Sequence, residues 1–475
     1  MNTRNLTHGI PARLFPVVTE ACKEQKTLSI ILATMISVRP FAERVLAPLS
    51  IKLGKRSSVN CFTEVTLENE VKGLKDRPDA LIVVDSGKKS WSALIEAKVG
   101  KNVVEPDQLS RYIELAKLNN VDALITISNE LTPAPDINPT QLPRALPKSV
   151  QLFHLSWASL LTTAFLLATS KEDPYDNDDE AFLISELIRY LEHANSGLLP
   201  LAQMNKDWPK IISDVQAGHP LSSKSKEVTE MITTWLQEAR DVALIMTRRL
   251  KESVSIVTSR SNLNNPSAWG DADAKSFVNE KLLRFELDVP NAVSKICVEA
   301  DFLRRAIRVS MKLGAPTDKA SNSARLNWLL RQLSKGDKEK IIVRCITRGK
   351  GQNFGAMATE IEPKSDEIKA LSEIVSFQVE MSVDLGARFN SRKKFIESLE
   401  EIVPEFYQNV GQHLQPFVPS PPKLKEKSED IMQAHQNEEI GAEESDSVHS
   451  QESNKENRPH WAAHWQTPPV SSDGA

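Results

Sequence analysis

Two carboxylates and a lysine stand close together in the N-terminal part of the chain. Asp79 precedes one short apolar run, and Glu96 and Lys98 belong to the next. Because successive side chains of a strand point to opposite faces, Glu96 and Lys98 share a face and Ala97 points to the other. The two carboxylates and the backbone carbonyl of Ala97 would form an oxygen-only ligand set, which suits Mg²⁺ or, in its place, Mn²⁺. Lys98 would then orient an attacking water or help to deprotonate it.

The surrounding pattern predicts the elements that must position these residues. Two apolar runs separated by a polar turn at residues 81–99 indicate a pair of strands. A helical period follows at residues 109–118, and Gln108 and Tyr112 share one face of that helix because they are four residues apart. Another apolar run at residues 122–128 predicts the next strand. The expected order is therefore strand, turn, strand, helix, strand.

In this order the stretch resembles the PD-(D/E)XK nuclease superfamily, and in particular its RecB-like branch. The resemblance covers residues 27–128 only. It is carried by Pro78-Asp79, by Glu96-Ala97-Lys98 after sixteen intervening residues, and by Gln108 and Tyr112 in a Gln-x-x-x-Tyr pair.

The resemblance implies a restriction-endonuclease-like fold and the hydrolysis of phosphodiester bonds. It assigns metal binding to Asp79 and Glu96, which would hold one or two Mg²⁺ ions. It also implies that Lys98 positions the water and that Gln108 and Tyr112 are a supporting pair. A plain alternative stays open, in which Glu96 and Lys98 form an exposed salt bridge worth at most about 1 kcal/mol.

The family also tends to carry an acidic residue on a helix ahead of the sheet. Residues 28–35 have a helical stripe that Pro40 interrupts or restarts, and Glu43 lies early in the following segment. Glu43 is therefore the first candidate for a further metal ligand, and Glu64 in a strand-like segment is the second. An ordinary surface carboxylate explains either residue equally well.

His154 lies in an apolar run with no nucleophile placed beside it, so we interpret it as an ordinary strand residue.

The whole chain is expected to be an α/β protein with several parts. Its 475 residues predict about three domains. The expected parts are a nuclease-like mixed sheet flanked by helices at residues 1–170, a helical segment at 178–260, an α+β domain at 270–415, and a disordered acidic tail at 416–475.

Residues 228–250 carry an apolar stripe with spacings of three and four, close to a coiled-coil seam. The stripe would form either a hairpin core within the chain or a homodimer contact. A dimer would suit a nuclease that cuts both strands of a duplex.

A basic face is expected on the α+β domain. Residues 301–350 hold thirteen lysines and arginines against four acids, although the formal net charge of the whole chain is -4. Such a face could contact phosphates without reading bases, or it could simply be solvated. The candidate nucleic-acid contacts are Arg304, Arg308, Lys312, Arg344, Arg348 and Lys350.

The termini and the cysteines bear on compartment and partners. The N-terminus has no continuous apolar segment behind a basic start, which favours a cytoplasmic protein without a membrane partner. Four widely spaced cysteines fit a reducing compartment and no structural zinc. In the tail, Trp461 and Trp465 could dock on a protein partner.

The sequence thus predicts a Mg²⁺-dependent nuclease acting on nucleic acid, with DNA as the first choice. Restriction, repair and anti-phage defence are the settings that the resemblance implies. Two alternatives remain open, a catalytically silent nuclease fold that binds nucleic acid and a protein that assembles a complex.

Overall fold

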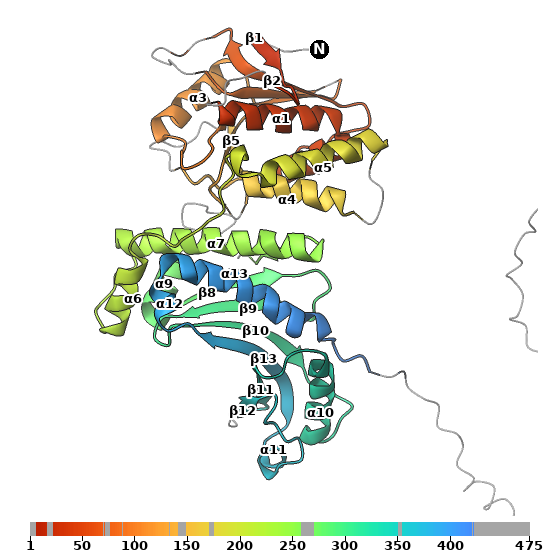
Figure 1. Ribbon diagram of the computed structural model, residues 1–475, viewed down its shortest axis with the longest axis vertical. Coiled ribbons are helices and arrows are strands. Elements are labelled where there is room, and N and C mark those ends of the chain that lie inside the picture. The colour runs from red at the N-terminus through yellow and green to blue at the C-terminus, as the bar shows by residue number, and fades with distance from the viewer. Residues whose placement is uncertain are drawn as a thin grey trace, which may run out of the picture. The chain divides into compact units, whose positions relative to one another are not determined.

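The computed structural model describes residues 6–16, 22–69, 71, 77–87, 89–132, 134–140, 149–170, 175–257, 270–349, 354–419 and 421. Over these residues the chain is a mixed α/β protein with two sheets (Figure 1). The described residues up to Pro419 form one compact unit. The predicted acidic tail, with Trp461 and Trp465, lies outside the described residues apart from 416–419 and 421.

A six-stranded mixed sheet is formed by the N-terminal part of the chain. Its strands lie side by side in chain order; β1 to β4 are antiparallel to one another, and β4, β5 and β6 are parallel. This topology confirms the mixed sheet expected here. The strands are β1 (Leu6–Pro11), β2 (Ser58–Leu67), β3 (Ala80–Asp85), β4 (Ser90–Ala97), β5 (Ala123–Ser128) and β6 (Gln151–Ser156).

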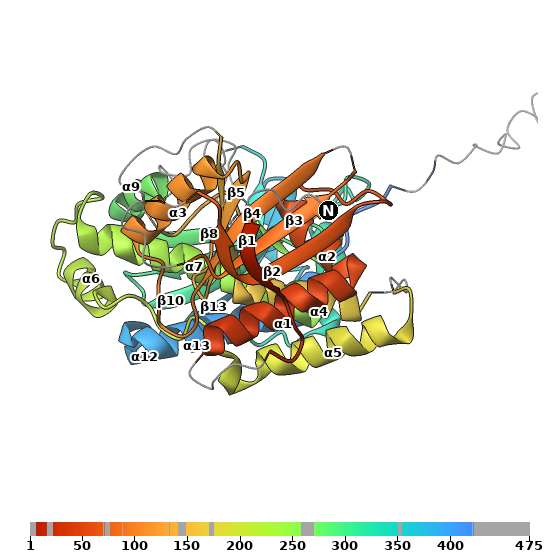
Figure 2. The same cartoon turned by 90° about the horizontal axis from the view of Figure 1, so that it is seen from above.

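Helices cover both faces of this sheet (Figure 2). Ile82 and Ile95 belong to the core on one face, whereas Leu81 and Leu94 belong to the core on the other. Because both faces are buried, the central strands are apolar at nearly every position. The helices are α1 (Lys23–Ser37), α2 (Arg39–Leu46), α4 (Trp157–Ala168) and α5 (Asp178–Glu192) on the first face and α3 (Pro106–Leu118) on the second.

A second, fully antiparallel sheet of seven strands follows, in the order β12-β11-β13-β10-β9-β8-β7. It confirms the α+β character expected for this region. The strands are β7 (Ser255–Ile256), β8 (Leu282–Asp288), β9 (Ile296–Asp301), β10 (Ala306–Gly314), β11 (Ile341–Thr347), β12 (Phe354–Met357) and β13 (Ile374–Asp384).

Helices pack on one face of this second sheet. In β8 the side chains of Leu283, Phe285 and Leu287 are buried and alternate with exposed ones, which is the pattern of a half-covered strand. The helices are α6 (Trp208–Gln216), α7 (Lys226–Leu250), α9 (Asp271–Glu280), α10 (Asn322–Gln332), α11 (Asp366–Ala370), α12 (Ala387–Asn390) and α13 (Arg392–Asn409).

The apolar stripe of α7 is buried within the chain. Met231, Trp235, Val242 and Met246 are all fully buried in the core that includes the second sheet. These side chains therefore form a core within the chain, as in the first alternative. Because they are buried, they are not available to contact a second copy of the protein. A homodimer stays a prediction without an assigned surface.

Leu6–Pro11 pair with β2 as an edge strand ahead of α1. The Phe182 side chain on α5 is exposed. The helices between residues 178 and 250 share no separate core, since α5 joins the core of the first sheet and α6 and α7 that of the second. Among the described helices, none has the length and apolar character of a membrane span.

Candidate active site

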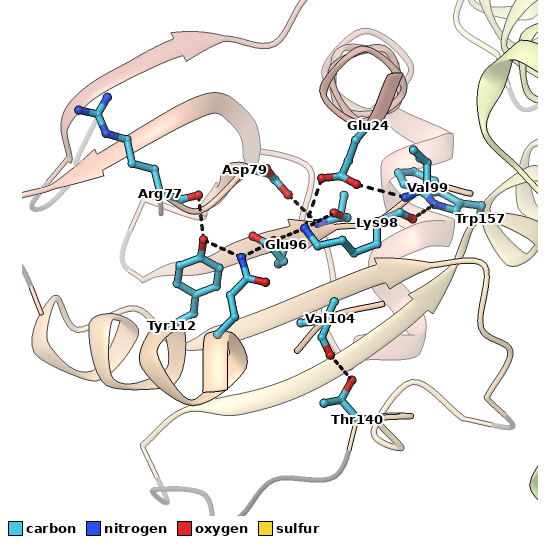
Figure 3. Close-up of polar contacts among 12 residues, drawn as sticks. Glu24, Arg77, Asp79, Glu96, Lys98, Val99, Val104, Tyr112, Thr140 and Trp157 are labelled. Carbon is cyan, nitrogen blue, oxygen red and sulfur yellow. Dashed lines mark hydrogen bonds and ion pairs between the residues drawn. The ribbon is translucent and has the colours of Figure 1, made fainter. Parts of the chain in front are cut away.

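The antiparallel pairing of β3 and β4 brings Asp79 and Glu96 together. Ala80 pairs with Ile95, so the preceding Asp79 comes opposite Glu96 at the end of the two strands. A hydrogen bond between backbone and side chain fixes this arrangement, because the Asp79 Oδ2 atom accepts from the Ala97 N–H at 2.8 Å. The predicted strand pair thus places both carboxylates at the same end of two central strands (Figure 3).

Lys98 follows β4 directly, although its strand was expected to continue to residue 99. Its backbone N–H donates to the Ile127 carbonyl at 2.7 Å, and its carbonyl accepts from the Trp157 indole at 2.8 Å. The ammonium group donates to Glu96 Oε1 and, at 3.1 Å, to the Ala97 carbonyl. The lysine is therefore held against the oxygen atoms that were predicted as metal ligands (Figure 3).

Helix α3 supplies the supporting pair, and it covers the face of the sheet to which the Glu96 side chain points. Gln108 Nε2 donates to Glu96 Oε1 at 2.8 Å and to the Tyr112 hydroxyl at 3.3 Å. The Tyr112 hydroxyl donates to the Arg77 carbonyl at 2.9 Å, close to the start of β3. These contacts fix the Glu96 carboxylate and the chain ahead of Asp79. The structure thus brings together all five residues that were predicted to be catalytic.

Helix α1 adds a third carboxylate, Glu24, which the sequence reasoning missed. Its Oε1 atom lies 3.3 Å from the Lys98 ammonium, and its Oε2 atom accepts from the Val99 N–H at 3.2 Å. Helix α1 begins at Lys23, before the apolar stripe that marked it in the sequence. Glu24 is the acidic residue of its first turn, and first-turn acids are a recognisable signal of a helix start.

The two residues predicted for this role lie elsewhere. Glu43 is on α2 and pairs with Arg39 at 2.9 Å, one helical turn away. The Glu64 side chain is exposed and accepts from Gln25 at 2.6 Å. Glu43 as a metal ligand therefore stays a prediction, and its contact with Arg39 is the one expected of a surface carboxylate. Arg39 explains the outcome, since a carboxylate one turn after an arginine finds its partner on its own helix.

Burial and mutual repulsion set the charge state of the site. Burial, together with the charge of Glu96, raises the pKa of Asp79 to about 8. Burial also raises the pKa of Glu96, although Lys98 acts in the opposite direction. Burial opposes the charge of Lys98, but Glu96, Asp79 and Glu24 outweigh it and raise its pKa. The site therefore favours a charged lysine among carboxylates that are hard to ionise.

The donor set fits a hard divalent cation. Asp79, Glu96, Glu24 and the Ala97 carbonyl offer only oxygen atoms, and Glu96 Oε2 is buried without a hydrogen-bond partner. Their present arrangement surrounds the Lys98 ammonium. The described residues contain a different group of three acids, Glu238, Asp241 and Glu400. Their ligand atoms lie within 4.8 Å of one another.

His154 is a structural residue of β6, as expected. Its ring nitrogens contact Thr126 Oγ1 at 2.9 Å and the Glu130 carbonyl at 2.8 Å. Burial lowers its pKa to about 4, so the ring stays neutral near neutral pH.

The expected basic face of the second sheet is largely neutralised. Arg308 lies 3.0 Å from Glu299, and Arg344 lies 2.7 Å from Glu380. Arg304 also lies within 4.0 Å of Asp301, and Arg348 within 4.0 Å of Glu373. Lys312 is exposed, and Lys350 lies outside the described residues.

The acids that neutralise this face explain why its charge was overestimated. Glu299, Glu373 and Glu380 lie outside the fifty-residue window that looked basic, and strand pairing brings them to it. The paired arginines are therefore weaker candidates for phosphate contacts than the sequence suggested.

Comparison of the chain with protein-family models, with curated proteins and with solved structures finds no match in any of the three.

Proposed function

We propose that the N-terminal domain is a metal-dependent nuclease that hydrolyses phosphodiester bonds in nucleic acid, with DNA as its substrate. The observation that supports this most is the convergence of Asp79, Glu96 and Lys98 at the end of β3 and β4. The order of these residues along the chain supports a place in the PD-(D/E)XK superfamily. Restriction, repair and anti-phage defence, all in the cytoplasm, are the settings that we propose with it.

The ligands for Mg²⁺, or for Mn²⁺, would be Asp79, Glu96 and the Ala97 carbonyl, with Glu24 next to them. A bound ion would supply a polarised phosphoryl oxygen and a water of lowered pKa. Gln108 holds Glu96 Oε1 by a hydrogen bond of 2.8 Å, which fixes the rotamer of that carboxylate. Precise placement of the reacting groups is worth several kcal/mol in such sites, so this hydrogen bond matters for rate.

Lys98 acts through its charge in this proposal. A general base needs a pKa near the working pH, whereas the three carboxylates raise the pKa of Lys98. The ammonium therefore orients water and stabilises negative charge on the phosphate as the bond breaks. The Lys98 ammonium now contacts Glu96, so it would have to leave that carboxylate in order to contact a phosphate. This favours binding of metal and substrate together.

The test is a cleavage assay with the full chain on supercoiled, linear and single-stranded DNA and on RNA. Reactions contain Mg²⁺, Mn²⁺ or EDTA, and they compare wild type with Lys98→Ala. Lys101→Ala is the matched control, because Lys101 is exposed and lies only three residues away. We expect metal-dependent cutting of DNA that is lost in Lys98→Ala and kept in Lys101→Ala.

Two results would reject the catalytic assignment. If wild type binds DNA but never cuts it under any condition, the silent binding module takes its place. If Lys98→Ala cuts as fast as wild type, any nuclease activity comes from another site. Circular dichroism of each variant separates loss of function from loss of fold.

A further inference from the structure

A second group of acidic side chains lies between α7 and α13, the two long helices on the second sheet (Figure 1). Glu238 and Asp241 are three residues apart on α7, so they share a face, and Glu400 comes from α13. One carboxylate oxygen of each residue lies within 4.8 Å of the corresponding oxygens of the other two. These residues, called the α7/α13 cluster below, share no residue with the candidate active site.

Glu238 is the unusual member of this cluster. Its side chain is completely buried, with 0% exposure, and neither carboxylate oxygen has a hydrogen-bond partner. A buried carboxylate normally has several such partners, because burying an unpaired charge is strongly unfavourable. Glu238 therefore has a carboxylate oxygen within 4.8 Å of oxygens of Asp241 and Glu400, and neither of its own oxygens has a hydrogen-bond partner.

The nearby cations do not compensate this charge. Arg248 acts on Asp241 and Glu400, and Arg249 acts on Glu400. Glu238 instead experiences burial and the charges of Asp241 and Glu400, all of which raise its pKa. Arg248 is also engaged elsewhere, since its Nη1 atom donates to the Thr162 hydroxyl at 2.8 Å.

Two further groups complete the surroundings. The backbone of Leu201 lowers the pKa of Asp241, and Glu397 adds another negative charge beside Glu400. Among the described residues named around the cluster, the acids thus outnumber the arginines.

We propose that the α7/α13 cluster is a binding site for a hard divalent cation, with Glu238, Asp241 and Glu400 as its protein ligands. Two oxygen ligands of one ion are separated by at most about 5.2 Å for Ca²⁺ and about 4.2 Å for Mg²⁺. The separation of up to 4.8 Å is within the limit for Ca²⁺, and a smaller ion would draw the carboxylates closer together. The ion would bind both unpartnered oxygens of Glu238 and would link α7 to α13.

The exposure of the three residues fits this assignment. Glu238 and Asp241 are buried, whereas Glu400 is half-buried and leaves one side of the site open. Water can complete the coordination shell from that side, as it does in most Mg²⁺ and many Ca²⁺ sites. A proton shared among the carboxyl groups is the competing occupant, and the experiment separates the two.

The experiment counts bound ions on the full chain. Protein stripped with EDTA is dialysed against Mn²⁺, Mg²⁺ or Ca²⁺ at neutral pH, and bound metal per chain is measured by atomic emission. The variants are Glu238→Gln and Glu400→Gln in the cluster. Glu401→Gln is the matched control, because Glu401 is the next residue of α13 and is exposed. Glu96→Gln separates this site from the candidate active site.

We expect both cluster variants to lose one bound ion, with a rise in Kd of at least about tenfold. Glu401→Gln should keep that ion, and Glu96→Gln should keep it as well. If Glu238→Gln does not fold, Glu400→Gln carries the test alone. Equal ion binding by wild type and the cluster variants would overturn the proposal and assign the cluster to protons.

Discussion

Two groups of carboxylates in this protein differ in the surroundings of their most buried member: Glu96 contacts a cation, whereas Glu238 does not. At the end of β3 and β4, the Lys98 ammonium lies between Glu96 and Glu24. In the α7/α13 cluster, Glu238 has no cation and no hydrogen-bond partner. The first group is balanced by the protein itself, so an ion must compete with a lysine there. The second group is unbalanced, so an ion or a proton must come from solvent.

The largest expected effect is the loss of the internal cation. Lys98→Ala leaves the buried Glu96 without its charge partner, and breaking such a pair costs about 3 kcal/mol of unfolding free energy in the absence of metal. Urea denaturation in EDTA measures this. Lys101→Ala should stay within about 0.5 kcal/mol of wild type, as expected for an exposed site. Equal stability of the Lys98 and Lys101 variants would mean that the lysine does not balance the site.

The matching change in the other cluster should have the opposite sign. Glu238→Gln removes a buried carboxylate that nothing compensates, so in EDTA it should stabilise the fold by about 1–2 kcal/mol. With added divalent cation the order should reverse, because only wild type gains the bound ion. A destabilised Glu238→Gln protein in EDTA would show that Glu238 has an internal partner after all, and the contrast between the two clusters would fail.

Variants of Glu24 and Glu43 test which of these two carboxylates belongs to the candidate active site. Glu24→Gln removes a carboxylate that contacts Lys98, and we expect its rate of DNA cleavage to fall about tenfold. Glu43→Gln removes only an ion pair on α2, worth about 0.3–0.5 kcal/mol, and should cut at the wild-type rate. Single-turnover cleavage in Mg²⁺ compares them. A larger loss for Glu43→Gln than for Glu24→Gln would restore the original assignment.

The smallest effect concerns pH. Burial, then Asp241 and Glu397, raises the pKa of Glu400 from 4.5 to about 7. This folded-state pKa is above the unfolded value. Between the two pKa values, Glu400 is therefore protonated in the folded protein and ionised in the unfolded chain. Stability should therefore fall as pH rises from about 4.5 to 7, by about 1 kcal/mol after allowance for solvent screening. The measurement is the urea midpoint of wild type and of Glu400→Gln in metal-free buffer across this pH range. If the midpoint of Glu400→Gln falls with pH as steeply as that of wild type, another group causes the pH dependence.

How far the sequence predicted each region depended on the range of the contacts involved. The pairing of β3 with β4 uses two apolar runs and one short turn, so the meeting of Asp79, Glu96 and Lys98 was predictable from local pattern. Gln108 and Tyr112 follow from helical spacing on the next element. Period-two alternation also marks β8 and β11 as strands with one buried face.

Contacts between distant segments were not predictable in the same way. Glu24 reaches Lys98 across seventy-four positions, and Glu380 reaches Arg344 across thirty-six. No local pattern states which acid a given cation will meet, so a charge count over a sequence window overestimated the basic face. The α7/α13 cluster joins positions on two helices with most of the second sheet between them in sequence. Its chemistry became visible only when the helices were packed.

The most direct test of the central claim is DNA cleavage by wild type and by Glu96→Gln, each in Mg²⁺ and in EDTA. Glutamine keeps the shape of Glu96 and removes only the negative charge that would bind the ion. The account predicts cutting by wild type in Mg²⁺ alone, and a rate at least about a thousandfold lower for Glu96→Gln with the fold intact. Cutting by Glu96→Gln at the wild-type rate, or by wild type in EDTA, would contradict the account.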